Sequence, residues 1–204
     1  MYKIIYIAGF LLLFACKETK PDATSSEIKK DSVEKSSDHS INKDKSDSYF
    51  IYTKWDHINK PKESYQSAEF TVRLQSDLDE ARNIGGKKVY VNGKEIDFLV
   101  TDAYVFTPFI LTNGSEKILL LQEEDESGTY GYRFYYFNKE KLVKKGILDI
   151  APDDDTLATE QFITFKNKPQ YIVPIIVADQ YYDTSLDKIM PSAGYSFTID
   201  KTAR

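Results

Sequence analysis

The 204-residue chain has one cysteine, two histidines and no surplus of basic side chains, and each shortage excludes a class of protein. A single cysteine excludes an intramolecular disulfide framework and a zinc site built from several cysteines. Two histidines leave little for a histidine-based metal centre. Acidic side chains outnumber basic ones by 32 to 27, so the chain lacks the positive charge that neutralises nucleic-acid phosphates. We therefore expect no nucleic-acid partner.

The sequence also lacks an apolar run long enough to cross a bilayer as a helix. The longest run covers residues 4–15 and follows Lys3, the only charged residue before it. A transmembrane helix needs about 20 apolar residues. A basic start, a short apolar stretch and a small residue at the end are instead typical of an export signal peptide. We predict a signal peptide over residues 1–15.

The end of this run, Leu13-Phe14-Ala15-Cys16, resembles the lipobox of bacterial lipoproteins. In that family the signal peptide is cleaved before the cysteine, which becomes the lipid-modified N-terminus. The resemblance implies that Cys16 carries several fatty acyl chains and anchors the protein durably, since one chain gives only marginal membrane binding. The alternative is a free thiol after an ordinary signal peptide.

The residue after Cys16 bears on which membrane holds the anchor. In the lipoprotein family an aspartate at this position marks retention in the inner membrane, and this chain has Lys17. The resemblance therefore implies the outer membrane, with the protein facing either the periplasm or the cell surface.

Residues 16–48 have the composition of a tether. After Cys16, the 32 residues 17–48 include only four apolar side chains, and the remainder are mostly Lys, Asp, Glu and Ser. Such a segment buries too little apolar surface to offset the entropy of ordering. As a flexible coil it spans roughly 30 Å, or about 105 Å when extended. An amphipathic helix formed on a partner is the alternative, because Ile28 and Val33 share a helical face.

Residues 49–204 predict one all-β domain. They contain 13 Tyr, 10 Phe and the single Trp, together with 19 basic and 24 acidic side chains. Short runs of Val, Ile, Tyr, Phe and Thr alternate with turn residues. Four hairpins are expected, with turns at Asn92-Gly93, Asn113-Gly114, 138–141 and 166–169. Further strands are expected at 49–54, 69–74 and 195–199, and Pro174 indicates an edge strand or a bulge.

Helix is expected in only two short stretches. Ser76, Asp79 and the pair Gly85-Gly86 have the spacing of a capped helix, and Pro191 would stop a helical turn over 185–190. Consecutive hairpins with so little helix predict an antiparallel meander that forms a sandwich or a partly open barrel.

A row of aromatic residues at 130–137 gives the first candidate binding site. Simple alternation places Tyr130, Tyr132, Phe134 and Tyr136 on one face of a strand, and Arg133, Tyr135 and Phe137 on the other. If one face is core, the other exposes rings beside a guanidinium, which suits stacking on sugars or gripping a protein. The alternative is a central strand covered on both faces, with Arg133 paired at its rim.

The second candidate is Trp55-Asp56-His57, which holds the only tryptophan and the only histidine of the domain. A histidine beside an acid could act as a general base. Neither a cysteine nucleophile nor a serine in a strand–turn–helix elbow accompanies it. We therefore retain Trp55 and His57 as binding residues and predict no catalytic residue.

Two acidic runs complete the candidates. Asp149, Asp153 and Asp155 could supply oxygen ligands to calcium, the only cofactor that we consider, although the spacing is not that of an EF-hand. The alternative is a solvated acidic loop. Residues 123–126 are a second run, and paired carboxylates can serve a glycoside hydrolase.

From the sequence we expect a lipid-anchored envelope protein whose β domain binds a protein or a glycan without catalysis. One alternative is an inhibitor or immunity protein against a cell-wall lytic enzyme, because an acidic surface suits a basic enzyme. Another is a hydrolase that uses the carboxylates of the two acidic runs.

Overall fold

A computed structural model of the chain describes residues 48–59, 63–68, 70–154 and 156–202. The predicted signal peptide, Cys16 and nearly all of the tether lie outside these residues. The described chain is almost entirely strand, arranged in four antiparallel sheets, so the predicted all-β class and antiparallel architecture are confirmed. None of its helices has the length and apolar content that crossing a bilayer requires.

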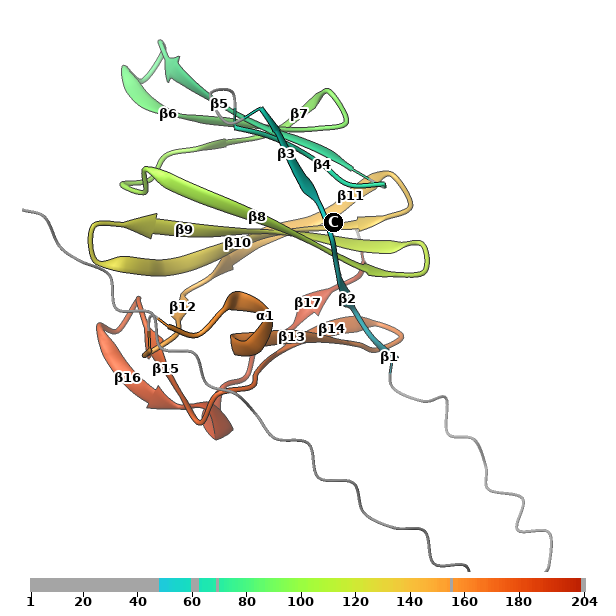
Figure 1. Cartoon of the computed structure of the whole chain (residues 1–204), viewed down its shortest axis with the longest axis vertical. Coiled ribbons are helices and arrows are strands. Elements are labelled where there is room, and N and C mark those ends of the chain that lie inside the picture. Colours follow the sequence, from blue (N-terminus) through green and yellow to red (C-terminus); the bar gives the residue numbers. More distant parts are fainter. Residues whose placement is uncertain (1–47, 60–62, 69, 155, 203–204) are drawn as a thin grey trace, which may run out of the picture. The chain divides into compact units, whose positions relative to one another are not determined.

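Two five-stranded sheets form most of the fold (Figure 1). The central sheet has the order β11-β10-β9-β8-β2 and comprises β2 (Ile51–Thr53), β8 (Val105–Asn113), β9 (Glu116–Asp125), β10 (Gly128–Asn138) and β11 (Lys141–Leu148). The second sheet is a meander of β3 (Asp56–Asn59), β4 (Ser64–Gln66), β5 (Thr71–Asp79), β6 (Ile84–Val91) and β7 (Lys94–Leu99). In both sheets, strands that follow one another in the chain are neighbours.

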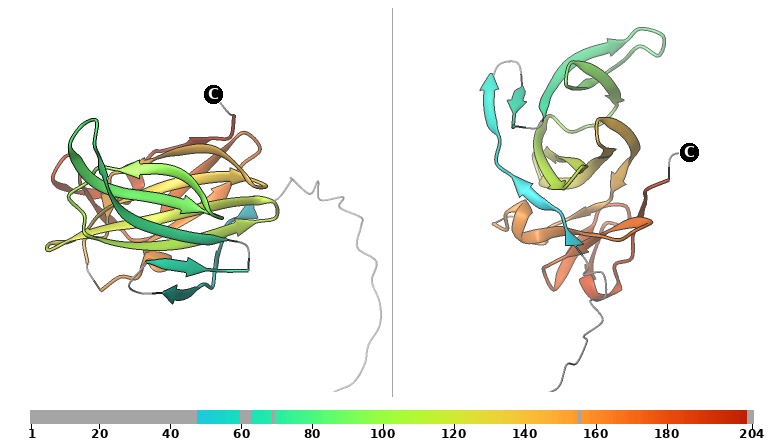
Figure 2. Two further views of the ribbon diagram at one scale, coloured as in Figure 1. Left: turned by 90° about the horizontal axis from the view of Figure 1, so that it is seen from above. Right: turned by 90° about the vertical axis from the view of Figure 1, so that its right-hand side faces the viewer.

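Two smaller sheets lie on the other side of the central sheet (Figure 2). One has the order β1-β13-β14-β17 and comprises β1 (Ser48–Tyr49), β13 (Ile163–Asn167), β14 (Tyr171–Ile176) and β17 (Ile199–Asp200). The other comprises β12 (Ile150–Ala151), β15 (Gln180–Asp183) and β16 (Lys188–Pro191). The helix α1 (Thr159–Phe162) and the 3-10 turn η2 (Ser192–Gly194) are the short helical pieces of the described residues.

The central sheet is buried on both faces, which makes the fold a layered sandwich. Alternate residues of β9 and β10 enter two cores: Leu120 and Phe134 pack against β13 and β14, whereas Leu119 and Tyr135 pack against β5–β7. This explains the uninterrupted apolar run Ile118–Leu121, in which every side chain has 0% exposure. A strand covered on one face only would alternate apolar and polar residues.

The predicted hairpins are confirmed, because their turns are determined by local chemistry. Asn92 and Gly93 join β6 to β7 with positive φ angles of 50° and 79°, the geometry that Asn-Gly favours. The β8–β9 turn falls one residue later than predicted, since Asn113 still pairs with Glu116. The edge strand or bulge expected at Pro174 is not found, because β14 lies between β13 and β17 and its register with β13 is regular. Pro174 is tolerated there because β17 pairs only with Tyr171 and Ile172.

The two predicted helices are wrong. Residues 76–79 continue β5 and pair with 84–87 of β6, where Asp77 opposes Gly86. The capping residues serve a four-residue turn instead: Asp79 accepts a hydrogen bond from the Arg82 backbone, and Asn83 has a φ of 53°. Residues 185–187 likewise lie in the turn between β15 and β16, and residues 188–190 are the first residues of β16. Helix caps and turns use the same residue types. Strand pairing with residues outside the segment therefore decides which of the two forms.

Two of the predicted strands are also corrected. The strand expected at 49–54 is divided at the buried Phe50, because β1 pairs with β13 while β2 pairs with β8. Of the strand expected at 195–199, only Ile199 is in strand, as part of β17.

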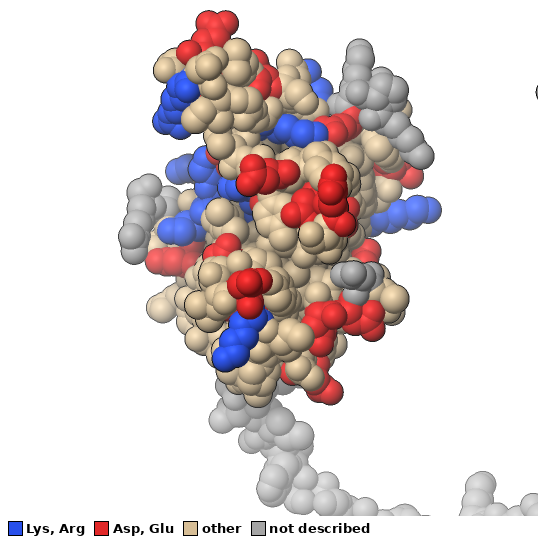
Figure 3. Space-filling view, turned by 90° about the vertical axis from the view of Figure 1, so that its left-hand side faces the viewer, with Lys and Arg blue, Asp and Glu red and all other residues tan. Residues whose placement is uncertain are grey.

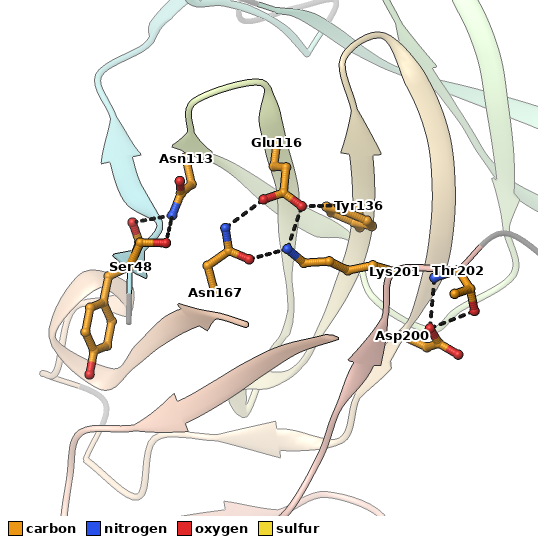
Figure 4. Close-up of polar contacts among 9 residues, drawn as sticks. Ser48, Asn113, Glu116, Tyr136, Asn167, Asp200, Lys201 and Thr202 are labelled. Atoms are coloured by element: carbon orange, nitrogen blue, oxygen red, sulfur yellow. Dashed lines mark hydrogen bonds and ion pairs between the residues drawn. The ribbon is translucent and has the colours of Figure 1, made fainter. Parts of the chain in front are cut away.

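A partly buried carboxylate ties the C-terminal segment to the central sheet (Figure 4). The Glu116 carboxylate accepts hydrogen bonds from the hydroxyl of Tyr136 and, at 2.6 Å, from the side-chain amide of Asn167. The Lys201 ammonium lies 2.6 Å from the same carboxylate, and both side chains of that ion pair are less than a fifth exposed. Although burial alone would raise the pKa of Glu116, the hydrogen bonds from Lys201, Tyr136 and Asn167 hold it below its usual value.

We expect Lys201→Met to lower the free energy of unfolding by about 2 kcal/mol, because it leaves a mostly buried carboxylate without its cation. A lowered pKa in the folded state means that Glu116 contributes stability above about pH 4.5 and loses it as the pH falls through the folded pKa. Urea unfolding at neutral and acid pH should show the Lys201→Met deficit shrinking in acid. A deficit equal at both pH values would contradict this role. Lys188→Met, at an exposed position, is the control.

Candidate functional site

The described domain has a hollow of about 770 Å³ at the end of the central sheet where β9 and β10 join. Its walls come from that turn, from the 100–102 segment, from residues around β12 and from the β15–β16 hairpin. Among the described residues, five carboxylates line it and Arg133 is the one basic residue; the acids are Asp102, Glu123, Asp125, Asp149 and Asp153. Figure 3 faces this end of the sheet and shows acidic side chains gathered over its middle. We call this site the acidic hollow.

A β-bulge in β10 shapes the floor of the acidic hollow. Thr129 pairs with Glu124 and Gly131 pairs with Glu123, so Tyr130 is an extra residue opposite β9. The bulge reverses the alternation of side chains, as bulges do. Tyr130 therefore packs with the core that holds Tyr135, whereas Tyr132 lies in the opposite core. The predicted grouping of Tyr130 with Tyr132 on one face is wrong for this reason.

An ion pair lies in the acidic hollow. The Nε atom of Arg133 donates to Oε1 of Glu123 at 2.5 Å, and the Glu123 side chain is only 3% exposed. Burial raises the pKa of Glu123, the guanidinium opposes that shift, and the negative charge of Asp149 adds to it. Because Arg133 already neutralises Glu123, the remaining four acids give the hollow an excess of negative charge.

Tyr130 attaches the 100–103 segment to this site. Its hydroxyl is hydrogen-bonded to the hydroxyl of Thr101, which also accepts a hydrogen bond from the backbone of Ala103. Burial raises the pKa of Tyr130. The ring is partly buried, so Tyr130 positions one wall of the hollow and still lines it.

Exposed aliphatic side chains border the carboxylates. Val100, Ile147 and Ile189 line the acidic hollow and are 47%, 42% and 52% exposed. A site that mixes aliphatic side chains with unpaired carboxylates suits a ligand with an apolar stem and a cationic head, which are the features of a lysine or arginine side chain.

The predicted platform of exposed rings is not present. Tyr132 and Tyr135 both have 0% exposure, because β10 lies between two cores. The hydroxyl of Tyr135 donates to Asp97 at 2.9 Å, and the Lys145 ammonium lies 2.6 Å from the same carboxylate. The alternative expected from the sequence, a central strand covered on both faces with Arg133 paired at its rim, is confirmed.

Trp55 and His57 do not line the acidic hollow. The His57 ring stacks on the Tyr65 ring with centroids 4.3 Å apart, and the Trp55 ring is tilted against Tyr65 with centroids 4.4 Å apart. His57 is exposed, and these ring contacts add to the pairing of β3 with β4. The structure therefore separates Trp55 and His57 from Tyr130 and Arg133.

The two acidic runs, distant in the sequence, meet in the acidic hollow. Glu123 and Asp125 come from the first run, and Asp149 and Asp153 from the second. Asp155 lies outside the described residues. Within the part of the chain that the structure describes, no three acidic, histidine or cysteine side chains are grouped closely enough to hold a metal ion. The Asp154 carboxylate instead accepts hydrogen bonds from the backbone and hydroxyl of Thr156, which lower its pKa.

Sequence reasoning missed Asp102, Val100, Ile147 and Ile189 as site residues. None of them belongs to a motif. Their exposure depends on where the ends of strands from three sheets meet. Among the acids of the hollow, only those of the two acidic runs were recognisable in the sequence, and they were recognisable as two separate runs.

Comparison of this chain with models of known protein families, with curated proteins and with solved structures found no match. Its function must therefore be inferred from its own residues.

Proposed function

We propose that this chain is a lipid-anchored bacterial envelope protein whose β domain binds a protein partner through the acidic hollow. The observation that carries the proposal is the composition of the hollow: four carboxylates beyond the Arg133–Glu123 pair, bordered by exposed aliphatic side chains. The motif ending at Cys16 supports the anchor, and Lys17 supports the outer membrane as its location.

The partner in this proposal is a protein with a projecting lysine or arginine, in preference to a glycan. Sugar binding usually relies on an exposed ring face. The rings of Tyr132 and Tyr135 are buried, and the two rings that line the hollow, Tyr130 and Tyr182, are only partly exposed. Carboxylates and aliphatic side chains instead match the head and stem of a basic side chain. A basic lytic enzyme of the cell wall is one protein of this kind, so an inhibitor function is a special case of the same proposal.

A hydrolase is the second candidate, because the hollow brings both acidic runs together. Glu123 is buried with a raised pKa and senses the charge of Asp149, a pairing that a general acid and its partner carboxylate require. The hydrogen bond that Arg133 donates to Glu123 favours the binding function, since the guanidinium opposes the protonated form of Glu123 that a general acid needs.

Photo-crosslinking from the hollow tests the binding function. A photoreactive residue at Ile189 of the full chain, in intact cells that make the protein, should capture a specific basic partner, because this side chain borders the carboxylates. Combining Asp102→Asn, Asp149→Asn and Asp153→Asn should reduce that product about tenfold, since each exposed charge pair contributes about 0.5 kcal/mol.

The matched control places the same photoreactive residue at Ile58, which is 55% exposed and does not line the hollow. Equal products from Ile189 and Ile58, or a product unaffected by the three Asp→Asn changes, would refute the binding function. Turnover of a cell-wall glycan that is lost in Glu123→Gln would favour the hydrolase instead.

A further inference from the structure

The opposite end of the central sheet has a second hollow, of about 420 Å³, whose charge is reversed. It lies between the β6–β7 turn and the β10–β11 turn. Among the described residues, four lysines and one acid, Glu140, line it; the lysines are Lys94, Lys117, Lys139 and Lys141. We call this site the lysine hollow. Because β10 runs from Gly128 at the acidic hollow to Asn138 beside the lysine hollow, the two sites lie at opposite ends of one strand.

Three of these lysines differ from the paired lysines of the domain. Lys94, Lys139 and Lys141 are exposed, and within the described residues no carboxylate lies in ion-pair contact with them. By contrast, Lys87, Lys88, Lys145 and Lys201 each pair with an acid. A net-acidic domain that brings Lys94, Lys139 and Lys141 together at one end has a surface there that is suited to an anion.

The floor of the lysine hollow is apolar and rigid. Phe70, Val91 and Phe137 line it and are at most 5% exposed. The Lys117 ammonium lies over the Phe70 ring, 5.2 Å from its centroid. Lys139 lies in a turn, and Lys94, Lys117 and Lys141 lie at the starts of β7, β9 and β11. Their charges are therefore held together over a packed core at one end of the sheet.

The chain enters the described domain at this same end. The Asn113 side chain, in the β8–β9 turn, donates to the hydroxyl of Ser48 and to the carbonyl of Tyr49, each at 3.0 Å (Figure 4). The backbone of Lys139 donates to the carbonyl of Ser115 in that turn at 2.8 Å. Ser48, the first described residue, thus lies at the end of the central sheet that carries the lysine hollow, opposite the end that carries the acidic hollow.

We propose that the lysine hollow docks on the anionic, phosphate-bearing surface of the membrane that holds the anchor, which turns the acidic hollow outward to its partner. This inference rests on the anchor of the proposed function. Charge complementarity selects the occupant, because lysines near an anionic bilayer each strengthen binding about fivefold. An anchor with a short tether keeps the domain at high effective concentration near that surface, so a weak contact suffices to orient it.

Energy transfer to labelled lipid head groups tests this orientation. The full chain is reconstituted in vesicles of phosphatidylcholine, with or without phosphatidylglycerol, after Ser115→Cys or Ser127→Cys has supplied one dye site. Both serines are exposed turn residues, Ser115 beside the lysine hollow and Ser127 in the acidic hollow, and Cys16 is the only native cysteine. On anionic vesicles transfer should be stronger from position 115 than from position 127, and on neutral vesicles the two should be alike.

Charge variants give the specific control. Combining Lys94→Gln, Lys139→Gln and Lys141→Gln should abolish the difference between the two positions. Combining Lys54→Gln, Lys144→Gln and Lys188→Gln removes the same charge elsewhere and should leave the difference intact. Thermal unfolding of both triple variants checks that they fold. Equal transfer from positions 115 and 127 on anionic vesicles, or a difference that survives loss of the three hollow lysines, would overturn the inference while the anchor stands.

Flotation of the same samples separates the anchor from the lysine hollow. A chain that floats with neutral vesicles has a working anchor. A chain that does not float with neutral vesicles has no working anchor, and flotation with anionic vesicles then tests the lysine hollow alone. Binding to anionic vesicles that falls roughly 100-fold in the triple variant of Lys94, Lys139 and Lys141 supports membrane docking. Absence of binding to anionic vesicles overturns it. A soluble acidic polysaccharide that binds through the three lysines, while anionic vesicles change nothing, would also overturn the membrane as occupant.

Discussion

Arg133→Met is expected to lower the free energy of unfolding by about 3–5 kcal/mol at neutral pH. The change leaves the Glu123 carboxylate, which is 3% exposed, without the guanidinium that lies 2.5 Å away. Breaking a buried ion pair from one side leaves an uncompensated charge, and this costs more than the pair contributes as a whole. Urea unfolding monitored by the fluorescence of Trp55 measures the loss.

The pH dependence of Arg133→Met follows from Glu123. Burial already raises the pKa of this carboxyl, and removing Arg133 raises it further. When the pKa of an acid is higher in the folded state than in the unfolded state, protonation favours folding. The loss in the free energy of unfolding is therefore full above the folded pKa and disappears as the pH falls through it. The variant should therefore approach the stability of the wild type as the pH falls from neutrality towards about 4.5.

Two controls separate this effect from loss of packing. Arg82→Met, at a side chain that is 71% exposed, should change stability by no more than about 0.5 kcal/mol. The double variant Glu123→Gln with Arg133→Met removes both charges and should recover most of the loss. If Arg133→Met and Arg82→Met lower the free energy of unfolding by the same small amount, the Arg133–Glu123 pair has no structural importance.

Photo-crosslinking at Ile189 in the double variant is a separate test, which shows whether partner binding needs the Arg133–Glu123 pair itself.

Gly86→Ala is expected to be about as damaging, with a loss of at least about 3 kcal/mol in the free energy of unfolding. A Cβ atom at position 86 would lie 2.3 Å from the backbone carbonyl oxygen of Leu99 and 2.7 Å from the ring of Phe98. A backbone atom in a sheet cannot withdraw as a flexible side chain can. We therefore expect β6 and β7 to separate locally, and urea unfolding to start at lower denaturant.

The neighbouring glycine provides the matched control for Gly86→Ala. A Cβ atom at Gly85 would meet no atom within 4 Å. Gly85→Ala should therefore leave stability unchanged or raise it slightly, because alanine has less conformational freedom to lose on folding. Equal losses from the two substitutions would mean that β6 and β7 do not approach each other as described.

The glycine pair also shows why part of the fold could not be read locally. Gly85-Gly86, with Ser76 and Asp79 before it, has the spacing of a helix C-terminus. In the structure the close approach of Phe98 and Leu99 requires Gly86, and the pairing of Asp77 with Gly86 makes the segment a strand. The need for glycine was visible in the sequence, but its cause lies on another strand.

The candidate site shows the same division. Both acidic runs and the aromatic strand were recognisable, because composition is local information. The meeting of Asp149 with Glu123 depends on the register of β11, β10 and β9, in which Leu148 pairs with Tyr132 and Tyr132 with Gln122. The burial of Tyr132 and Tyr135 depends on sheets that cover both faces of β10. The bulge at Tyr130 has no local marker except Gly131, so simple alternation predicted the wrong face.

By itself the sequence determined the all-β class, the hairpins with their turns and the acidic character of the site, since these follow from backbone preferences of short segments and from side-chain charge. Only the tertiary structure decided which strands lie between two cores, which acids line one hollow and which lysines line the other. The physical reason is that burial and electrostatic potential are sums over neighbours in space, and most of those neighbours are distant in the chain.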